Sequence, residues 1–329
     1  MIISRTPFRI SFFGGGTDYP VWFEKFGGAV LGTTIDKYCY ITCRYLPQFF
    51  EHKHRIVYSQ IENVREIDEI NHPAVRETLR FADIKKGVEI HHDGDLPART
   101  GLGSSSAFTV GLLHALYGLK GVMPDKMRLA KDAIYIEQEI IKECVGCQDQ
   151  VLVSFGGLKR VDFNHGKDID PQPIMVRPER YEALQNHLLL FFTGFSRTAS
   201  AVASEQIKET PNRVRELTQM QLMVGEAIKI LNDDCDLLDF GRLLNESWQL
   251  KRSLTSKITT PEIDEIYRTA MKAGAVGGKL LGAGGGGFML IFASPKLHSR
   301  VKESLHGFLH VPFRFENTGS QIIFYEPDT

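Results

Sequence analysis

Asp149 closes a polar run that begins at Glu137, and two glycine-rich segments flank that run along the chain. The upstream segment, Leu96–Ala107, is rich in glycine and serine, and the downstream segment holds five glycines within 282–287. Glycine lets the backbone turn and approach a phosphate group closely. Phosphate binding next to a polar, acidic run is the pattern of a small-molecule kinase.

The upstream segment runs directly into the apolar, helix-forming stretch 108–116. Gly101 and Gly103 would allow the chain to turn, and the free N–H groups at the start of the helix would favour an anion. Three consecutive serines add hydroxyl oxygens that suit phosphate or Mg²⁺. The alternative is an ordinary helix N-cap, since serine and glycine are also common before helices.

The downstream glycines fit neither of two familiar nucleotide-binding patterns. The cluster at 282–287 satisfies G-x-G-x-x-G, yet it leads into a strand-like run, so a dinucleotide-binding fold is not expected. The preceding stretch, 274–280, is one residue shorter than a Walker loop and has Leu280 where a hydroxyl must meet Mg²⁺. So many glycines instead suggest backbone that is pressed against a ligand.

The composition excludes several classes of protein. The 329 residues are 43% hydrophobic and 24% charged, which suits about two domains with sizeable cores. Lysine plus arginine (39) nearly balances aspartate plus glutamate (40), which argues against an extended nucleic-acid surface. No apolar run is long enough to span a membrane, and no leader pattern opens the chain. The five cysteines include one C-x-x-C, too little for a zinc site, so a reduced cytoplasmic protein is expected.

The first half of the chain is predicted to mix short strands with helices. Runs at 29–35 and 38–45 are rich in β-branched and aromatic residues, and Asp36 with Lys37 would form the two-residue turn of a hairpin. The hydrophobic periodicity and the helix-start signals predict further elements. These are helices at 104–119 and 125–142 and a strand at 157–163.

A polar, proline-bearing segment at 164–180 separates the two halves, so we predict domains of residues 1–180 and 181–329. Helices dominate the start of the second half and strands its end, which indicates an α/β sandwich with helices on one face. The expected strands are 187–192, 287–292, 312–316 and 321–325, and the expected helices are 197–209, 212–232, 236–254, 261–273 and 295–306.

Across nearly its whole length the chain resembles the GHMP kinase superfamily, which includes galactokinases, homoserine kinases and mevalonate kinases. Three family motifs have counterparts here in the same order: Thr6–Tyr19, Pro97–Ala107 and Lys279–Gly287. The resemblance implies an α+β fold with an N-terminal ribosomal-S5-like α/β domain and a C-terminal ferredoxin-like α/β sandwich. It also implies ATP and Mg²⁺ as cofactors, with ATP held by the second motif through Pro97, Thr100, Gly101, Leu102, Gly103, Ser104, Ser105 and Ser106.

The resemblance further implies roles at the reaction centre. The spacing of Glu137 and Asp149 is similar to the galactokinase pattern, in which a helical Glu binds Mg²⁺ and an Asp serves as base. Ser104 and Glu137 would then ligate Mg²⁺, and Asp149 would take the proton of the acceptor hydroxyl. Arg9, which matches the motif-one cation of relatives, would stabilise the resulting anion or keep Asp149 ionised. An ordinary surface salt bridge is the alternative for Arg9.

The first motif also bears on the acceptor. Galactokinases carry Glu and His where this chain has Gly15 and Gly16, so a larger or differently held sugar is expected. Asp18 would still accept hydrogen bonds from sugar hydroxyls. The predicted substrate-binding residues of the first and third motifs are Gly15, Gly16, Thr17, Asp18, Gly284 and Gly285.

Segments 9–18, 192–197, 248–254 and 261–264 look like the heptose 7-phosphate kinase branch of the superfamily. That branch phosphorylates the anomeric hydroxyl of D-glycero-D-manno-heptose 7-phosphate on the route to nucleotide-activated heptose for surface polysaccharides. L-Fucokinase-like domains resemble the first motif as well, so a kinase of a neutral sugar is one alternative. A sugar or nucleotide sensor that has lost catalysis is another.

A phosphorylated acceptor needs cationic partners outside the ATP motifs. Arg197, Lys251 and Arg252 lie in segments that resemble the heptose branch, and we expect them to hold the phosphate of the sugar. The alternative is a solvated basic face, which is common on exposed helices. The expected partners are therefore a sugar phosphate and ATP, without nucleic acid or membrane, and both a monomer and a homodimer stay open.

Overall fold

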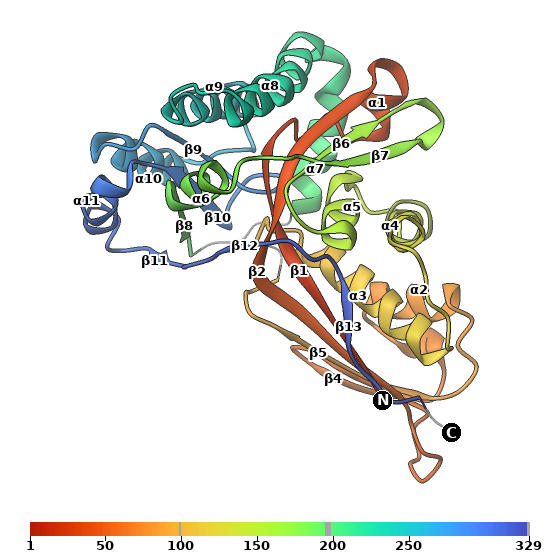
Figure 1. Ribbon diagram of the computed structural model, residues 1–329. Coiled ribbons are helices and arrows are strands. Elements are labelled where there is room, and N and C mark those ends of the chain that lie inside the picture. Colours follow the sequence, from red (N-terminus) through yellow and green to blue (C-terminus); the bar gives the residue numbers. More distant parts are fainter. Residues whose placement is uncertain (99, 195–198, 328–329) are drawn as a thin grey trace.

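The structure is a computed structural model that describes residues 1–98, 100–194 and 199–327. In this part of the chain a nine-stranded sheet and a four-stranded antiparallel sheet carry the helices (Figure 1). The first sheet holds β1 (Ile2–Phe13), β2 (Gly28–Tyr45), β3 (His54–Val57), β4 (Ile61–Val64), β5 (Val88–Gly94), β6 (Lys159–Phe163), β7 (Ile169–Pro173), β12 (Phe315–Glu316) and β13 (Gln321–Tyr325). The second holds β8 (Leu188–Phe192), β9 (Gly277–Leu280), β10 (Phe288–Phe292) and β11 (Leu309–His310), in the order β11-β8-β10-β9.

Each predicted helix has a counterpart near its predicted range, whereas the helices at 20–26, 73–81, 148–155 and 178–186 were not predicted. The helices are α1 (Pro20–Phe26), α2 (Pro73–Phe81), α3 (Ser104–Leu119), α4 (Lys126–Tyr135), α5 (Gln148–Phe155), α6 (Pro178–Asn186), α7 (Ala199–Glu209), α8 (Val214–Asn232), α9 (Leu238–Leu254), α10 (Pro261–Lys272) and α11 (His298–Ser304). Shorter helical turns are η1 (Ile67–Glu69), η2 (Ile136–Ile140), η3 (His165–Lys167), η4 (Thr210–Asn212) and η5 (Pro295–Leu297). No helix in the described ranges combines the length and the apolar composition that a membrane crossing needs.

One long strand, β2, replaces the hairpin predicted at 29–45. The strand runs unbroken through Asp36 and Lys37, which bulge out where the pairing of β2 with β1 shifts register beside Pro7. The backbone N–H of Asp36 donates to the Arg314 carbonyl (2.9 Å), and the Arg314 N–H donates to the Asp36 carboxylate (2.7 Å). The hairpin prediction was wrong because a segment from the far end of the chain satisfies the groups that a local turn would have paired.

The end of the chain returns to the first sheet, so the two termini lie close together (Figure 1). β13 pairs antiparallel with β1, and β12 pairs antiparallel with β2. The predicted strands at 312–316 and 321–325 were therefore assigned to the wrong half. β9 and β11 complete the second sheet in their place, and neither was predicted because glycine and short length hide the strand signal. The division at residue 180 itself stays a prediction.

Helices cover one face of the first sheet and connect it to the second. α3 is buried along most of its length against β1 and β2, and α4 and α5 pack beside it (Figure 1). α8 and α9 form an antiparallel pair that contacts β1 as well as β9. Three predicted segments therefore meet where the two sheets adjoin. They are the first motif in β1, the glycines before β10, and the loop before α3 that includes Gly101 and Gly103, which we call the phosphate loop.

Candidate active site

Arg9 joins three of the predicted functional segments. Its side chain leaves β1 and donates two hydrogen bonds to the Asp149 carboxylate, from Nε at 2.7 Å and from Nη2 at 2.6 Å. Its Nη1 donates to the Gly101 carbonyl at 2.6 Å. Arg9 is 3% exposed and the Asp149 side chain 24%, so this is a partly buried, bidentate ion pair and not the surface salt bridge considered as the alternative. The structure thus brings Arg9, Asp149 and the phosphate loop together.

The phosphate loop has the conformation that its glycines suggested. Gly101 and Gly103 adopt positive φ angles of 85° and 73°, and Gly103 is the N-cap of α3. Ser104, Ser105 and Ser106 form the first turn of α3, and the N-terminal turn of a helix favours an anion. That ATP binds here, and which of these residues contact it, both stay predictions.

Three other residues of the predicted ATP site have structural partners. The Thr100 hydroxyl donates to the Pro97 carbonyl (2.8 Å) and closes the turn that precedes the glycines. Leu102 is fully buried, and its carbonyl accepts a hydrogen bond from the Arg9 N–H (3.0 Å). These contacts shape the loop, whereas the serines present hydroxyl groups at its helical end.

Glu137 is a buried carboxylate with one unused oxygen. Its Oε2 accepts hydrogen bonds from Ser106 Oγ (3.0 Å) and Gln150 Nε2, while Oε1 accepts none from the described residues. Burial raises the pKa of Glu137 to about 7. A desolvated carboxylate oxygen beside serine hydroxyls suits a hard cation such as Mg²⁺. The serine in contact is Ser106, so the assignment of Ser104 as a metal ligand stays a prediction.

A helical irregularity positions Glu137. The predicted helix 125–142 is regular only as far as α4, and a π-helical turn follows over η2, with the Ile141 N–H bonded to the Ile136 carbonyl. In a π-helical turn each hydrogen bond spans five residues instead of the four of an α-helix, and such turns are frequent at functional sites. Among the described residues no three His, Cys, Asp or Glu side chains cluster as a metal site, which is compatible with Mg²⁺, because Mg²⁺ takes few protein ligands beside phosphates.

Asp18 is a buried carboxylate near Asp149. It is 1% exposed, and its carboxylate accepts hydrogen bonds from the backbone N–H groups of Gly16 (2.9 Å) and Gln148 (3.3 Å). Burial raises its pKa, and the nearby charge of Asp149 acts in the same direction. A Cβ at Gly146 would lie 1.8 Å from the Asp18 carboxylate, so only glycine fits there.

The two glycines that replace galactokinase side chains differ in their surroundings. A Cβ at Gly15 would lie 3.6 Å from both Ser11 Oγ and Gln148 Nε2, which is ordinary contact. A Cβ at Gly16 would lie 2.6 Å from Gln206 Nε2, and the φ of 105° also favours glycine. Gly15 therefore leaves space beside polar groups, whereas Gly16 lets α7 pack closely. Thr17 uses its hydroxyl locally, on the Gly14 carbonyl (2.8 Å).

Ser11 and Gln148 are site residues that the sequence analysis missed. Ser11 Oγ and Gln148 Oε1 are buried and have no hydrogen-bond partner within the described ranges. Ser11 and Gln148 both lie within contact distance of a Cβ built at Gly15. Gln148 also bonds to Asp18 and directly precedes Asp149 in the sequence. The available signal was position alone, because one polar residue lies inside the first motif and the other directly precedes Asp149.

The outcome differs among the three cations that were predicted to hold a sugar phosphate. Arg197 lies outside the described residues. Lys251 is 6% exposed and donates to the Gly282 carbonyl, so it is not part of a solvated basic face. Arg252 pairs with Asp264 at 2.8 Å. Neighbours on one helix point in different directions, and the role of each in phosphate binding stays a prediction.

The second glycine cluster packs against the phosphate loop. A Cβ at Gly282 would lie 2.4 Å from the Gly101 Cα, and a Cβ at Gly287 would lie 2.2 Å from the Thr100 carbonyl oxygen. Contact between two backbones thus accounts for these glycines without a ligand. Gly284 and Gly285 face the backbone near Ile258, to which the Gly285 N–H donates (2.9 Å), and their role in substrate binding stays a prediction.

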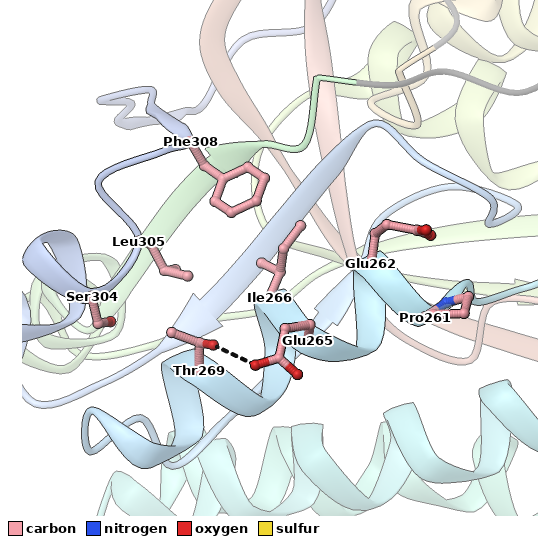
Figure 2. A pocket seen from close by; sticks show the side chains of 8 residues that line it. All are labelled: Pro261, Glu262, Glu265, Ile266, Thr269, Ser304, Leu305 and Phe308. Carbon is pink, nitrogen blue, oxygen red and sulfur yellow. Dashed lines mark hydrogen bonds between the residues drawn. The ribbon is translucent and has the colours of Figure 1, made fainter.

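A surface groove of about 430 Å³ lies away from this centre, between α10 and the chain after α11 (Figure 2). Glu262 and Glu265 border it, with Ile266 and Leu305 at its base. Figure 2 shows Glu265 bonded to Thr269 on the same helix. The groove contains none of the predicted site residues, and its carboxylates would repel a phosphorylated substrate.

Comparisons with known proteins agree with this arrangement. The family profile "GHMP kinases N terminal domain" matches residues 69–157, and "GHMP kinases C terminal" matches residues 231–310, together about half of the chain. The D-glycero-alpha-D-manno-heptose 7-phosphate kinase of Campylobacter jejuni is 29% identical over 92% of both chains. The bifunctional fucokinase/GDP-fucose pyrophosphorylase of Arabidopsis thaliana is 24% identical over 90% of this chain, which spans 31% of that larger protein.

A crystal structure described as a D-glycero-D-manno-heptose 1-phosphate kinase from Bacteroides thetaiotaomicron has the same fold, with a TM-score of 0.79. The two are 21% identical, and the superposition covers 97% of this chain and 98% of the other. The expected α+β architecture is thereby confirmed, with both profiles in their family order. The chain belongs to the GHMP kinase family and is an ATP-dependent kinase.

Proposed function

We propose that this kinase transfers the γ-phosphate of ATP to the anomeric hydroxyl of D-glycero-D-manno-heptose 7-phosphate and thereby makes the 1,7-bisphosphate. The observation that carries the proposal is the position of Asp149, which Arg9 holds between the phosphate loop and the buried Asp18. A similar relative in Campylobacter jejuni that bears the name of a heptose 7-phosphate kinase matches along nearly the whole chain, and this supports the choice of acceptor.

Asp149 would act as the general base. Both of its oxygens accept a hydrogen bond from Arg9, and each oxygen keeps a lone pair for the acceptor hydroxyl. The guanidinium orients the carboxylate through these two bonds. When the hydroxyl oxygen attacks the γ-phosphorus, its proton would pass to Asp149, and the bond to the ADP oxygen would break. The ring oxygen makes an anomeric hydroxyl more acidic than other sugar hydroxyls, which eases this proton transfer.

Glu137 would hold Mg²⁺ together with a serine hydroxyl of α3, as predicted for Ser104. Mg²⁺, when bound, supplies charge that offsets the negative charge of the phosphates. Ser106 and Gln150 fix one Glu137 oxygen and leave the other available. The first turn of α3 would hold the phosphates of ATP through its backbone N–H groups.

Asp18 and its neighbours would bind the sugar. Gly15 is bordered by Ser11 and Gln148, each of which has a buried polar atom without a partner among the described residues, and such atoms are expected to have a ligand. Hydroxyl groups of a sugar can both donate and accept, so they suit this set of groups. The reaction uses ATP, and the five cysteines are free thiols, which together fit a cytoplasmic enzyme.

A kinase of a neutral sugar is the second candidate, because two fucokinase-containing proteins are also similar to the chain. An ADP-release screen would separate the candidates. It would compare heptose 7-phosphate with unphosphorylated heptose, L-fucose and galactose at equal concentration, and phosphorus NMR would locate the new phosphate. We expect the highest kcat/KM with heptose 7-phosphate and the new phosphate at the anomeric carbon. A preference for L-fucose or galactose, or a phosphate elsewhere on the sugar, would contradict the proposal.

A further inference from the structure

Two lysines are buried at the junction of the sheets, and the mechanism above uses neither of them. Lys279, on β9, is 3% exposed, and its Nζ donates to the Phe12 carbonyl at 2.7 Å. Lys251, on α9, is 6% exposed, and its Nζ donates to the carbonyl groups of Leu280 (3.4 Å) and Gly282. In the described part of the chain no ion pair joins either ammonium group to a carboxylate.

These lysines belong to one cluster with Arg9. Lys251 is near enough to Arg9, Asp18 and Asp149 for their charges to act on it, and Lys279 is near enough to Lys251 and Arg9. Burial and the neighbouring cations lower the pKa of Lys251 to about 8, and the same causes lower the pKa of Lys279 well below its usual value. Three buried basic side chains thus face two carboxylates, and Arg9 already occupies one of these, Asp149.

An uncompensated buried ammonium group is strongly unfavourable, so its presence calls for a partner that offsets the charge. The partner must be an anion, and the surroundings leave donors free to bind it. An ammonium group has three N–H donors, of which Lys279 uses one and Lys251 two on backbone carbonyls. At least three N–H groups therefore stay available at this junction.

The positions of the two groups point to the reacting phosphate. Lys251 holds Gly282, whose backbone packs on Gly101 of the phosphate loop. Lys279 holds Phe12, two residues before the glycine turn of the first motif. Arg9, on the same strand as Phe12, donates to the Gly101 carbonyl. The two ammonium groups thus bond to the backbone of the second glycine cluster and of the first motif, the segments that adjoin Arg9 and the phosphate loop.

We propose that Lys279 and Lys251 bind a phosphate dianion between the two glycine loops, either the γ-phosphate of ATP or the phosphate carried by the acceptor. The chemistry is the same for both sources, because each supplies the negative charge that the cluster lacks. The inference rests on the kinase activity of the chain, and the nucleotide arm of the test does not depend on heptose as the acceptor.

Lys279→Met and Lys251→Met remove the charge and keep a similar volume. Calorimetry would measure the affinity of each variant for one ligand at a time, so that no phosphate is transferred. It would compare ATP with ADP, and heptose 7-phosphate with unphosphorylated heptose. A fall of at least about tenfold in the ATP/ADP affinity ratio assigns the γ-phosphate. A similar fall in the ratio of the two sugars assigns the acceptor phosphate. Lys272→Met, on the exposed end of α10, is the matched control and should change neither ratio.

If both ratios stay within the error of the Lys272→Met control in both variants, the lysines only tether carbonyl groups and the proposal is wrong. Should the variants fail to fold, the wild-type protein decides. Binding of ATP or the sugar phosphate near pH 8.5, measured in buffers of different ionisation enthalpy, should take up protons, because a bound phosphate raises the pKa of the lysines. Asp18, Asp149 and Tyr19 face the same cluster. Binding of both ligands without proton uptake would overturn the inference.

Discussion

Charged side chains occur in two contrasting settings in this protein. On α2, Arg80 pairs with Asp68 at 2.5 Å and with Glu77 at 2.7 Å, and the Arg80 side chain is 43% exposed. At the junction of the sheets, Arg9, Lys251 and Lys279 are almost completely buried. Water screens the first group, so its pairs contribute little to the free energy of unfolding. The second group is costly to bury.

This difference in burial between the two groups of charges indicates where the fold binds its ligands. Good pairing geometry is therefore present on the surface as well as in the centre. The buried centre has short contacts together with excess charge and unused polar atoms such as Glu137 Oε1 and Ser11 Oγ. A folded protein keeps such unfavourable features mainly where a ligand satisfies them. Substitutions in the two settings should therefore differ in size and in kind.

The largest effect is expected for Asp149→Asn. The amide keeps the shape of the side chain but cannot take a proton, so kcat should fall by ~10²–10⁴. Nucleotide binding should hardly change, because, among the described residues, the hydrogen bonds to the Asp149 carboxylate come from Arg9 and not from the phosphate loop. Steady-state kinetics with saturating heptose 7-phosphate and a fluorescent nucleotide titration measure the two quantities. Near wild-type turnover in the variant would remove Asp149 from the role of base.

The next effect concerns pH and the buried lysine. The pKa of Lys251 is lowered from 10.5 to about 8 in the folded protein, so the unfolded chain binds more protons between these values. The stability contributed by this group is present above pH 10.5 and is lost as the pH falls through 8. Lys251→Met should be more stable than wild type at pH 7, and this advantage should shrink by on the order of 2 kcal/mol toward pH 10.

Chemical denaturation at pH 7, 8, 9 and 10 tests this dependence, with Lys272→Met as the exposed control. A difference between Lys251→Met and wild type that is the same at every pH would show that the ammonium group is not buried as described.

Glu137→Gln and Ser104→Ala should raise the Mg²⁺ concentration needed for half-maximal activity by about tenfold, because each removes or weakens a hard oxygen ligand. Glu139→Gln changes an exposed carboxylate two residues further along the same π-helical turn and is the matched control. Activity is measured against Mg²⁺ at fixed ATP. Overlapping Mg²⁺ curves for all three variants and wild type would show that the metal is held elsewhere.

The smallest effect is expected for Arg252→Ala. Its guanidinium is paired with Asp264 and partly exposed, so the free energy of unfolding should fall by less than about 1 kcal/mol. For the same reason the KM for the phosphorylated acceptor should change much less than in Lys251→Met. A large rise in this KM, with the KM for ATP unchanged, would restore Arg252 as a phosphate-binding residue and reduce the contrast between buried and surface cations.

Local patterns predicted most helices but not the partners of the strands. The helix at 104–119 and the strand at 187–192 appear within one residue of their predicted bounds, because apolar periodicity and composition act over a few neighbours. The turn at Asp36 and Lys37 failed, since the pairing that replaces it comes from residue 314. β12 and β13 were recognised as strands and placed in the wrong sheet for the same reason.

The sequence by itself determined the chemistry that is available here: the order of the three motifs, the glycines of the phosphate loop, and the family to which the chain belongs. Those features depend on residue type and spacing, which a linear chain displays. Only the tertiary structure decided that Arg9 spans Asp149 and Gly101, that Ser106 contacts Glu137, and that Lys251 points inward while Arg252 points to Asp264. Burial and direction are properties of packing between distant segments, and packing determines what each charge can do.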